Sequence, residues 1–562
     1  MSSSDTKQAA KETAIQDLDE TPLIRLGAGV QLFDEEFISQ LAAVLPEFLS
    51  TRRWYRAKTR SIERVEIEDT VPVPDADSHI CVIRILFKEE DVDTYLLPLT
   101  SAAGPDAMEI ASAAGDVIAR FQLANGTTGI VYGALWKQEF SNMLLSAVAC
   151  DSSFRGRWGE FAARRTRAFD RRCDRAEPVL TSVVSKAEQS NSSIVYGERY
   201  ILKLFRKVEP GVNPDLEIGE FLTEGGFRNT PAVMGTFEYR RGRSEPMQAG
   251  ILQAFVRNRG DAWKYTLESL AEFFPRALGA VKNQHAPILK SYHPLALVGD
   301  QGFAQEQTLI GSYLDSARLL GARTGEMHAA LAAANGNPEF TPEIFTSDDG
   351  QKLYDDMRGQ AETTFHLLRQ SGPTLTGSAG NAARRLLALE SEVQDRFASL
   401  RQYPVTALRI RHHGDFHLGQ VLFTGDDFMI IDFEGEPARP LVERRLKTLA
   451  MRDVAGMIRS FQYAAYAALF GQVPGVSTES AASTEAIESW ADFWTAAVSA
   501  EYLKGYFGAA SGASFMPSGR EEQRVLFDAF LLQKALYEVS YELNNRPSWV
   551  GIPLRGILSL LS

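Results

Sequence analysis

The spacing of apolar residues predicts one helix and several strands near the start of the chain. Residues 33–49 carry apolar side chains three and four positions apart, as the buried face of a helix requires. Three runs rich in β-branched residues follow, at 65–73, 80–87 and 94–99, and each predicts a strand. Together these elements predict a small α+β unit over residues 21–99.

The pattern is less regular between residues 107 and 174. We interpret this segment as helix-rich with a weak strand signal at 129–132, and its locally basic part, 154–172, as connector and helix. The earlier stretch 52–60 holds five cations and two aromatic residues. We expect Trp54 to seal the core beneath it, and the role of the cations stays open.

Strand-like runs return further along the chain. Two of them flank a serine- and asparagine-rich turn at 188–193, and such a turn offers hydroxyl and backbone N–H groups that suit phosphate oxygens. The second run, 199–205, encloses Lys203 among apolar residues, where an unpaired ammonium is costly. We therefore expect a carboxylate partner on the following helix, with Glu217 preferred over Glu220.

Helical periodicity dominates residues 261–562, for example at 316–333. The exception is a pair of short apolar runs on either side of Thr424-Gly-Asp-Asp427, which predicts a β-hairpin. Loops are expected at 336–349 and 374–380. The second half of the chain is thus predicted to be mostly helical.

Three polar side chains stand at informative positions around this hairpin. Asp415 precedes the first strand, Gln420 comes five residues later, and Asp432 ends the second strand. The catalytic region of protein kinases has this order. One aspartate accepts the proton of the substrate hydroxyl, an amide five residues on holds Mg²⁺, and a second aspartate holds Mg²⁺ against the phosphates. The spacing therefore predicts phosphoryl transfer.

Two plainer interpretations of the same stretch are weaker. An aspartate that closes a buried strand is often only a turn former. A metal cluster is the other interpretation, because His412, His413 and His417 lie close in sequence. Gly414 between them disfavours a regular helix and no cysteine is near, so a zinc site is disfavoured.

Composition and charge narrow the classes of partner. The 562 residues, 44% hydrophobic and 23% charged, are ordinary for a globular protein of three or four domains. The net charge of −13 disfavours nucleic acid or an anionic membrane as a partner. No apolar run approaches the roughly 18 residues of a membrane span. The three cysteines predict no disulfide framework and fit a reducing cytoplasm. Residues 1–20 are expected to be a disordered tail without an export signal.

Motifs spread over nearly the whole chain resemble those of maltokinases. In order, they are Arg52-Arg-Trp-Tyr-Arg-Ala-Lys58, Glu188-Gln-Ser-Asn-Ser-Ser193, Ile201-Leu-Lys-Leu-Phe-Arg206, Asn213-Pro-Asp-Leu-Glu217, Gly260-Asp-Ala-Trp263, His413-Gly-Asp-Phe-His-Leu-Gly-Gln-Val-Leu422, Asp432-Phe-Glu-Gly-Glu-Pro437, Arg452-Asp-Val-Ala-Gly-Met-Ile-Arg-Ser-Phe461, Lys534-Ala-Leu-Tyr-Glu538, Tyr541-Glu542 and Asn545-Arg-Pro-Ser-Trp549. The resemblance implies an α+β, bilobal protein-kinase-like fold of the aminoglycoside phosphotransferase type. It divides the chain into a tail (1–20), an N-terminal α+β cap (21–135), a segment leading into the kinase-like N-lobe (136–260) and a mostly helical C-lobe (261–562).

The resemblance also implies an activity. Maltokinases use ATP and Mg²⁺ to phosphorylate the anomeric hydroxyl of maltose, and the maltose 1-phosphate formed feeds α-glucan and glycogen synthesis from trehalose. A separate trehalose synthase is the implied protein partner. A related sugar or amino-sugar kinase is an alternative, because glucosamine kinases share the catalytic loop. An inactive kinase-like scaffold that binds trehalose synthase is a second alternative, against which the intact Lys203, Asp415 and Asp432 argue.

These considerations assign roles to candidate site residues. Asp415 is the candidate general base. Residues assigned to ATP are Gln189, Ser190, Asn191, Ser192, Lys203, Glu217, Gln253 and Phe255. Residues assigned to Mg²⁺ are Gln420, Asp432 and Glu434. Residues assigned to the sugar are His413, His417, Arg452, Asp453, Lys534, Tyr537, Glu538 and Tyr541, of which the last four share one face of a predicted helix.

Overall fold

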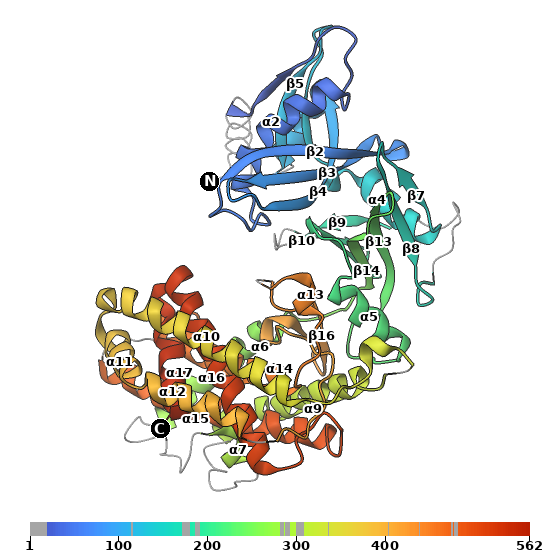
Figure 1. Ribbon diagram of the computed structural model, residues 1–562. Helices are drawn as coiled ribbons and strands as arrows, with labels where there is room; N and C mark the ends of the chain where they lie inside the picture. Colours follow the sequence, from blue (N-terminus) through green and yellow to red (C-terminus); the bar gives the residue numbers. More distant parts are fainter. Residues whose placement is uncertain are drawn as a thin grey trace. The chain divides into compact units, whose positions relative to one another are not determined.

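The computed structural model divides the chain into two compact units. The first comprises residues 1–220 and 231–256, and the second comprises residues 221–230 and 257–562. The structure describes residues 20–113, 116–170, 180–185, 191–280, 286, 293–298, 308–334, 336–402, 404–437, 439–473, 476 and 481–561. Within these residues the first unit holds two seven-stranded sheets, whereas the second is mainly helical (Figure 1).

The first sheet of the first unit packs against an amphipathic helix. Its order is β1 (Leu23–Arg25), β5 (Val117–Gln122), β6 (Thr128–Gly133), β4 (Val92–Ala103), β3 (Ser78–Phe87) and β2 (Ile62–Val73), with β12 (Lys207–Val208) also paired to β4. Helix α2 (Glu35–Thr51) buries Phe37, Leu41 and Leu45 in one core with the sheet, because these residues repeat on one helical face. Trp54 joins that core and is only 3% exposed, as expected. The structure therefore confirms the helix and three strands predicted for this region.

The second sheet of the first unit is antiparallel throughout. Its order is β7 (Ser153–Arg155), β8 (Gly159–Arg165), β13 (Val233–Arg241), β14 (Met247–Ala254), β11 (Tyr200–Phe205), β10 (Asn191–Tyr196) and β9 (Ser182–Val184). Helix α4 (Gln138–Ala149) packs against it, α3 (Pro105–Ala113) lies earlier in the chain, and α5 (Pro214–Glu224) follows β12.

The interpretation of residues 154–172 as connector and helix is wrong for the part that the structure describes. These residues form β7 and β8, and β8 pairs with β13 along its whole length. Phe161 and Ala163 are buried against the core and alternate with the more exposed Glu160, Ala162 and Arg164. Strand pairing with a distant segment thus outweighs the local charge pattern.

The second unit is built from helices around one hairpin. The helices are α6 (Ala262–Ala280), α7 (Pro294–Leu297), α9 (Tyr313–Leu331), α10 (Ser347–Ser371), α11 (Gly377–Ala388), α12 (Glu390–Ala398), α13 (Leu441–Arg444), α14 (Met451–Tyr466), α15 (Ala481–Ala509), α16 (Arg520–Asn545) and α17 (Gly551–Leu561). Helices α9 and α15 cross closely at Gly321. A Cβ there would lie 1.9 Å from the Tyr502 carbonyl oxygen, so the close approach requires glycine. The predicted hairpin forms from β15 (Val421–Phe423) and β16 (Phe428–Ile430). The loop predicted at 374–380 is shorter, because α11 begins at Gly377.

Two further sequence expectations concern cysteines and membranes. Cys81 is buried and free, but Cys150 is disulfide-bonded, which departs from the expectation drawn from the low cysteine count. Among the described residues, no helix is both long and apolar enough to cross a membrane.

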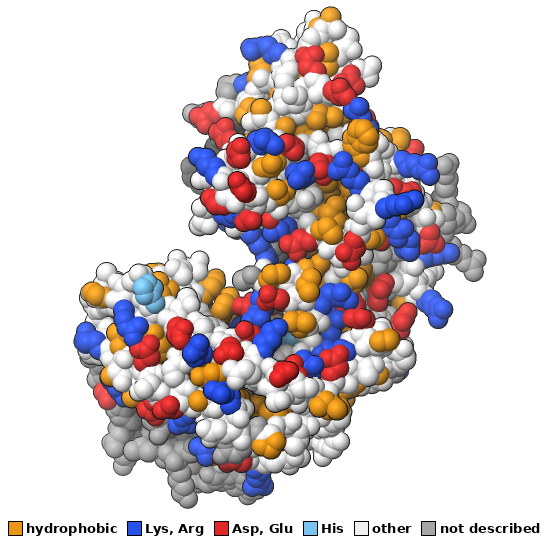
Figure 2. Space-filling model, viewed as in Figure 1, with side chains coloured by type: hydrophobic (Ala, Val, Ile, Leu, Met, Phe, Trp, Pro, Cys, Tyr) orange, Lys and Arg blue, Asp and Glu red, His pale blue; other side chains and the backbone are white. Residues whose placement is uncertain are grey.

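Figure 2 shows Lys and Arg side chains interspersed with Asp and Glu side chains over the face in view.

Candidate active site

The loop that carries Asp415 is held by a buried carboxylate in the second unit. Asp453 lies in the first turn of α14 and is 2% exposed. It accepts hydrogen bonds from the backbone N–H groups of His413 (2.7 Å) and Gly414 (3.0 Å), and His328 Nε2 lies 3.1 Å from it. Burial alone would raise the pKa of the Asp453 carboxyl, but the His328 hydrogen bond and the nearby His412 and His413 leave that pKa well below its usual range. An ionised carboxylate therefore anchors the loop.

Two glycines let the loop take its shape. Gly414 has φ +87°, and a Cβ there would lie 3.1 Å from the Cα of Gly435. Gly456 on α14 faces the loop, where a Cβ would lie 2.7 Å from the Phe416 carbonyl oxygen. The loop thus needs a left-handed backbone at one end and close contact with a helix at the other.

Asp415 itself is paired with a lysine from α16. Lys534 Nζ lies 3.2 Å from Asp415 Oδ1, and His417 Nε2 lies 3.9 Å from Asp415 Oδ2. Burial would raise the pKa of the Asp415 carboxyl, but Lys534, His417 and His413 lower it below its usual value. Burial would lower the pKa of Lys534, but Asp415, Glu538 and Glu436 raise it. Both groups are therefore charged near neutral pH.

A concave pocket opens beside Asp415, and we name it the Asp415 pocket. Its lining comprises Gln360, Gly414, Asp415, Phe416, Glu436, Arg439, Arg452, Asp453, Gly456, Phe530, Gln533, Lys534 and Tyr537. Glu436 accepts hydrogen bonds from Arg439 Nε (3.1 Å) and Arg452 Nη2 (3.3 Å). A second, larger pocket shares Gly414, Glu436, Arg439, Arg452 and Gln533 with it. Charged and aromatic groups therefore surround a concave site beside a carboxylate.

The residues assigned to a sugar fall into two groups. Arg452, Lys534 and Tyr537 line the Asp415 pocket. Tyr541 stands next to Tyr537 on α16, with ring centroids 6.5 Å apart, and is 45% exposed. His417 lies beside Asp415 and accepts a hydrogen bond from the Gly419 backbone N–H at 3.1 Å.

The other group makes structural contacts within the chain, and its assignment to a sugar stays a prediction. His413 is 1% exposed, and its Nε2 lies 2.9 Å from the Ile431 carbonyl oxygen. Glu538 is 9% exposed and accepts a hydrogen bond from Arg459 Nε at 2.9 Å. Asp453 lines the pocket, but its oxygens are bound to the loop. These contacts hold the site together, and each of the three side chains uses at least one polar atom in them.

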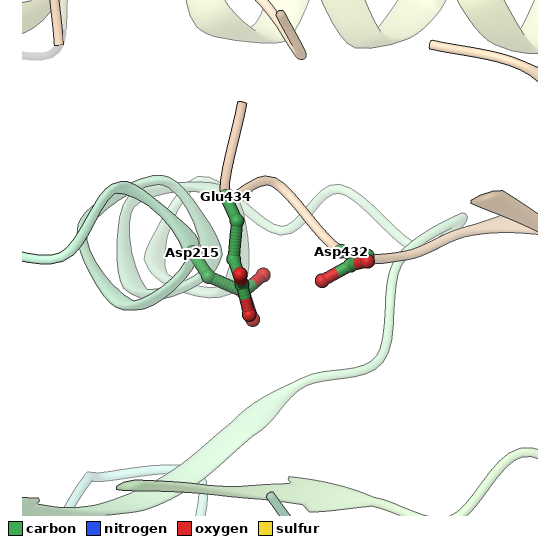
Figure 3. Close-up of side chains that lie close together, drawn as sticks. All are labelled: Asp215, Asp432 and Glu434. Atoms are coloured by element: carbon green, nitrogen blue, oxygen red, sulfur yellow. The ribbon is translucent and has the colours of Figure 1, made fainter. Parts of the chain in front are cut away.

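Oxygen donors gather after β16. Asp432 and Glu434 each offer a carboxylate oxygen, and these oxygens lie within 4.8 Å of one another (Figure 3). Asp432 has φ +68°, a left-handed conformation that is uncommon for non-glycine residues and is tolerated best by aspartate, asparagine and histidine. The carbonyl oxygen of Gln420 accepts a hydrogen bond from the Ile431 N–H at 3.0 Å, which holds the two segments together. Carboxylate oxygens are ligands that suit Mg²⁺, so Asp432 and Glu434 fit that ion, and the assignment of the Gln420 side chain to it stays a prediction.

The first unit contains the lysine singled out in the sequence. Lys203 lies in β11, between β10 and β14, and its Nζ is 3.0 Å from Asp215 Oδ2. Asp215 belongs to the first turn of α5 (Figure 3) and is 1% exposed. The sequence analysis passed over Asp215 in favour of Glu217, whose assignment stays a prediction. Both carboxylates lie in the first turn of α5, so the sequence held no signal that separated Asp215 from Glu217.

The serine-rich turn is only partly described. Gln189 and Ser190 lie outside the described residues, whereas Asn191 and Ser192 begin β10. Ser192 Oγ accepts a hydrogen bond from Arg206 Nε at 2.9 Å, and the Arg206 guanidinium stands 5.0 Å over the Trp54 ring.

The strand expected to end the N-lobe forms as β14. Gln253 lies opposite Ile201 in the pairing of β14 with β11. The N–H of Phe255, one residue past β14, donates to the Arg199 carbonyl oxygen at 2.8 Å. Both residues are half-buried, and their assignment to a nucleotide stays a prediction.

Other site residues escaped the sequence analysis. Glu436, Arg439 and Gln533 line the Asp415 pocket but were not assigned to the sugar. Glu436 and Arg439 follow the metal-donor segment, and their proximity to Asp432 was the available signal. Gln533 precedes Lys534 directly.

Comparisons with known proteins support this picture of the fold. Residues 48–136 match the maltokinase N-terminal cap domain. A glucosamine kinase of Streptacidiphilus jiangxiensis is 24% identical over 395 residues, which cover 69% of this chain and 75% of the relative. A glucosamine kinase of Mycolicibacterium smegmatis is 24% identical over 281 residues, which cover 50% of this chain and 58% of the relative.

Solved structures of glucosamine kinases have a fold similar to that of this chain. A glucosamine kinase in complex with glucosamine, ADP and inorganic phosphate superposes with a TM-score of 0.58 and 18% identity, covering 92% of this chain and 99% of that chain. Crystal form A of a glucosamine kinase gives a TM-score of 0.57 at 19% identity, covering 93% and 98%. The expected maltokinase-like fold of the aminoglycoside phosphotransferase type is confirmed.

Proposed function

We propose that this chain is a sugar kinase that transfers the γ-phosphoryl group of ATP to a sugar hydroxyl. The observation that carries the proposal is the ionised Asp415 at the mouth of a concave pocket, on a loop anchored by Asp453. A carboxylate beside a hydroxyl-binding pocket is what a general base requires. The overall likeness to glucosamine kinases supports the reaction type.

We further propose maltose as the acceptor, phosphorylated at its anomeric hydroxyl. The match of residues 48–136 to the maltokinase cap domain supports this choice. The larger pocket that adjoins the Asp415 pocket offers room for a second sugar ring. The product, maltose 1-phosphate, would supply glycogen synthesis in the cytoplasm, beside a separate trehalose synthase.

In the proposed mechanism Asp415 orients the acceptor hydroxyl and receives its proton. Lys203, held by Asp215, binds the phosphates of ATP as the strand lysine of kinases does. Asp432 and Glu434 would hold Mg²⁺, together with the Gln420 side chain that the sequence order assigns to it. An ion held there would neutralise charge on the phosphates.

A phosphotransfer assay tests the proposal. ATP, Mg²⁺ and maltose are incubated with the protein, and the phosphorylated sugar is identified by mass and by phosphorus NMR. Asp415→Asn should slow product formation about 10²–10⁴-fold, whereas Asp426→Asn, at an exposed position of the nearby hairpin turn, should leave it unchanged. Equal rates in Asp415→Asn and wild type would refute the role of Asp415.

The second candidate is a glucosamine kinase, which the names of the curated relatives favour. Parallel reactions with maltose, glucose and glucosamine separate the two candidates. If no ATP is consumed in the presence of any of these sugars, the result would favour an inactive scaffold instead.

A further inference from the structure

The carboxylates of the Asp415 pocket are already paired with groups of the chain itself. Asp415 contacts Lys534 at 3.2 Å, and Glu436 accepts from Arg439 and Arg452. Asp453 is bound by His328 and by two backbone N–H groups. Among the described residues lining this pocket, these three carry the carboxylates.

This pairing bears on which acceptors fit. The ammonium of an amino sugar needs a carboxylate or several acceptor oxygens to replace its hydration. In the Asp415 pocket it would have to displace a lysine or an arginine from its partner. A neutral sugar hydroxyl donates or accepts one hydrogen bond and can share these oxygens without displacing either cation.

We propose that Lys534 is an acceptor-specificity residue that excludes positively charged sugars from the site of phosphoryl transfer. The inference rests on the proposed function, because it concerns the acceptor of that reaction. Lys534 is suited to this role by position, since it contacts the candidate base directly and comes from a different element, α16. An ammonium that approached Asp415 would therefore meet a second positive charge beside the reacting hydroxyl.

The position of Lys534 is fixed by its surroundings. Its Nζ stands 5.1 Å from the centroid of the Tyr537 ring as well as beside Asp415. The neighbouring Glu538 pairs through Oε2 with the guanidinium of Arg459, which offsets its negative charge. The ammonium is thus a fixed part of the pocket wall.

The test compares two sugars that differ by one charged group. Glucose and glucosamine are used as competitors of maltose phosphorylation, at a pH at which the amine of glucosamine is protonated. In the wild type we expect glucosamine to compete at least tenfold more weakly than glucose. In Lys534→Met the difference in competition between the two sugars should fall below threefold, because methionine has a side chain of similar shape without the charge.

Controls separate charge from folding. Lys504→Met removes an ion-paired lysine of the same side-chain exposure, 30%, on α15 and should keep the difference. Lys534→Arg should also keep it. A pH series on the wild type gives a check that does not depend on whether a variant folds. The difference in competition between glucose and glucosamine should shrink as the pH rises through the pKa of the sugar amine.

The outcomes distinguish this inference from the proposed function. Equal competition by the two sugars in the wild type, or a difference that survives in Lys534→Met, would overturn the role of Lys534 while maltose phosphorylation stands. A wild-type protein that phosphorylates no sugar would overturn the proposed function, and this inference with it.

Discussion

Replacing Asp453 by asparagine removes the charge that anchors the loop of Asp415. The carboxylate is 2% exposed and binds two backbone N–H groups and His328. Asparagine keeps one acceptor oxygen but turns an NH₂ group toward a donor, so at least one buried N–H loses its partner. Buried groups that lose a charged partner in this way cost about 2–4 kcal/mol.

Part of this free energy raises the activation barrier of the reaction, and part lowers the free energy of unfolding. If about 2.7 kcal/mol of it falls on the positioning of Asp415, turnover drops about 100-fold. The remainder lowers the free energy of unfolding. We therefore expect Asp453→Asn to reduce kcat at least tenfold and to lower the urea midpoint, while Asp395→Asn, at an exposed position on α12, changes neither.

The pH dependence of stability gives a further check. The pKa of Asp453 is lowered in the folded state, so its contribution is present above the unfolded pKa and lost as the pH falls through the folded pKa. Wild type and Asp453→Asn should differ most in unfolding free energy near neutral pH. The difference should narrow below about pH 4, where the unfolded carboxyl is protonated. An unfolding midpoint and a kcat equal to those of the wild type at neutral pH would refute the anchoring role.

Three other variants test separate parts of the site. Asp415→Asn should lower kcat about 10²–10⁴-fold, with little change in ATP affinity measured by calorimetry, because the base acts in the chemical step; a comparable loss of ATP affinity would contradict this. Gly414→Ala should cost about 1–3 kcal/mol in urea unfolding, because φ is +87° and the Gly435 backbone is 3.1 Å away; an unchanged midpoint would show that the loop is not constrained. Asp432→Asn should raise the Mg²⁺ concentration needed for half-maximal turnover, and an unchanged Mg²⁺ titration would remove Asp432 from the metal set.

Much of the fold follows from local patterns in the sequence. The helical spacing of Phe37, Leu41 and Leu45 fixes the buried face of α2, and the turn around Thr424 fixes the hairpin. These features depend on neighbours within a few residues, so periodicity and turn chemistry are sufficient to predict them. Strands β7 and β8 were missed because β8 pairs with a partner about 75 residues away, which no local pattern reveals.

The site shows the same division. The order of Asp415, Gln420 and Asp432 could be recognised because one short stretch carries all three. The contact between Lys534 and Asp415 spans 119 residues, and the sequence showed only that Lys534 lies on a charged helical face. The anchoring contacts of Asp453 with the loop could not be predicted, because they depend on how α14 packs, which sequence spacing does not encode.

The most direct test of the central claim is phosphorus NMR of a reaction containing the protein, ATP, Mg²⁺ and maltose. The account predicts a new sugar phosphate resonance coupled to the anomeric proton of maltose, formed in step with ADP. ADP without any sugar phosphate, or ATP that remains intact, would contradict it.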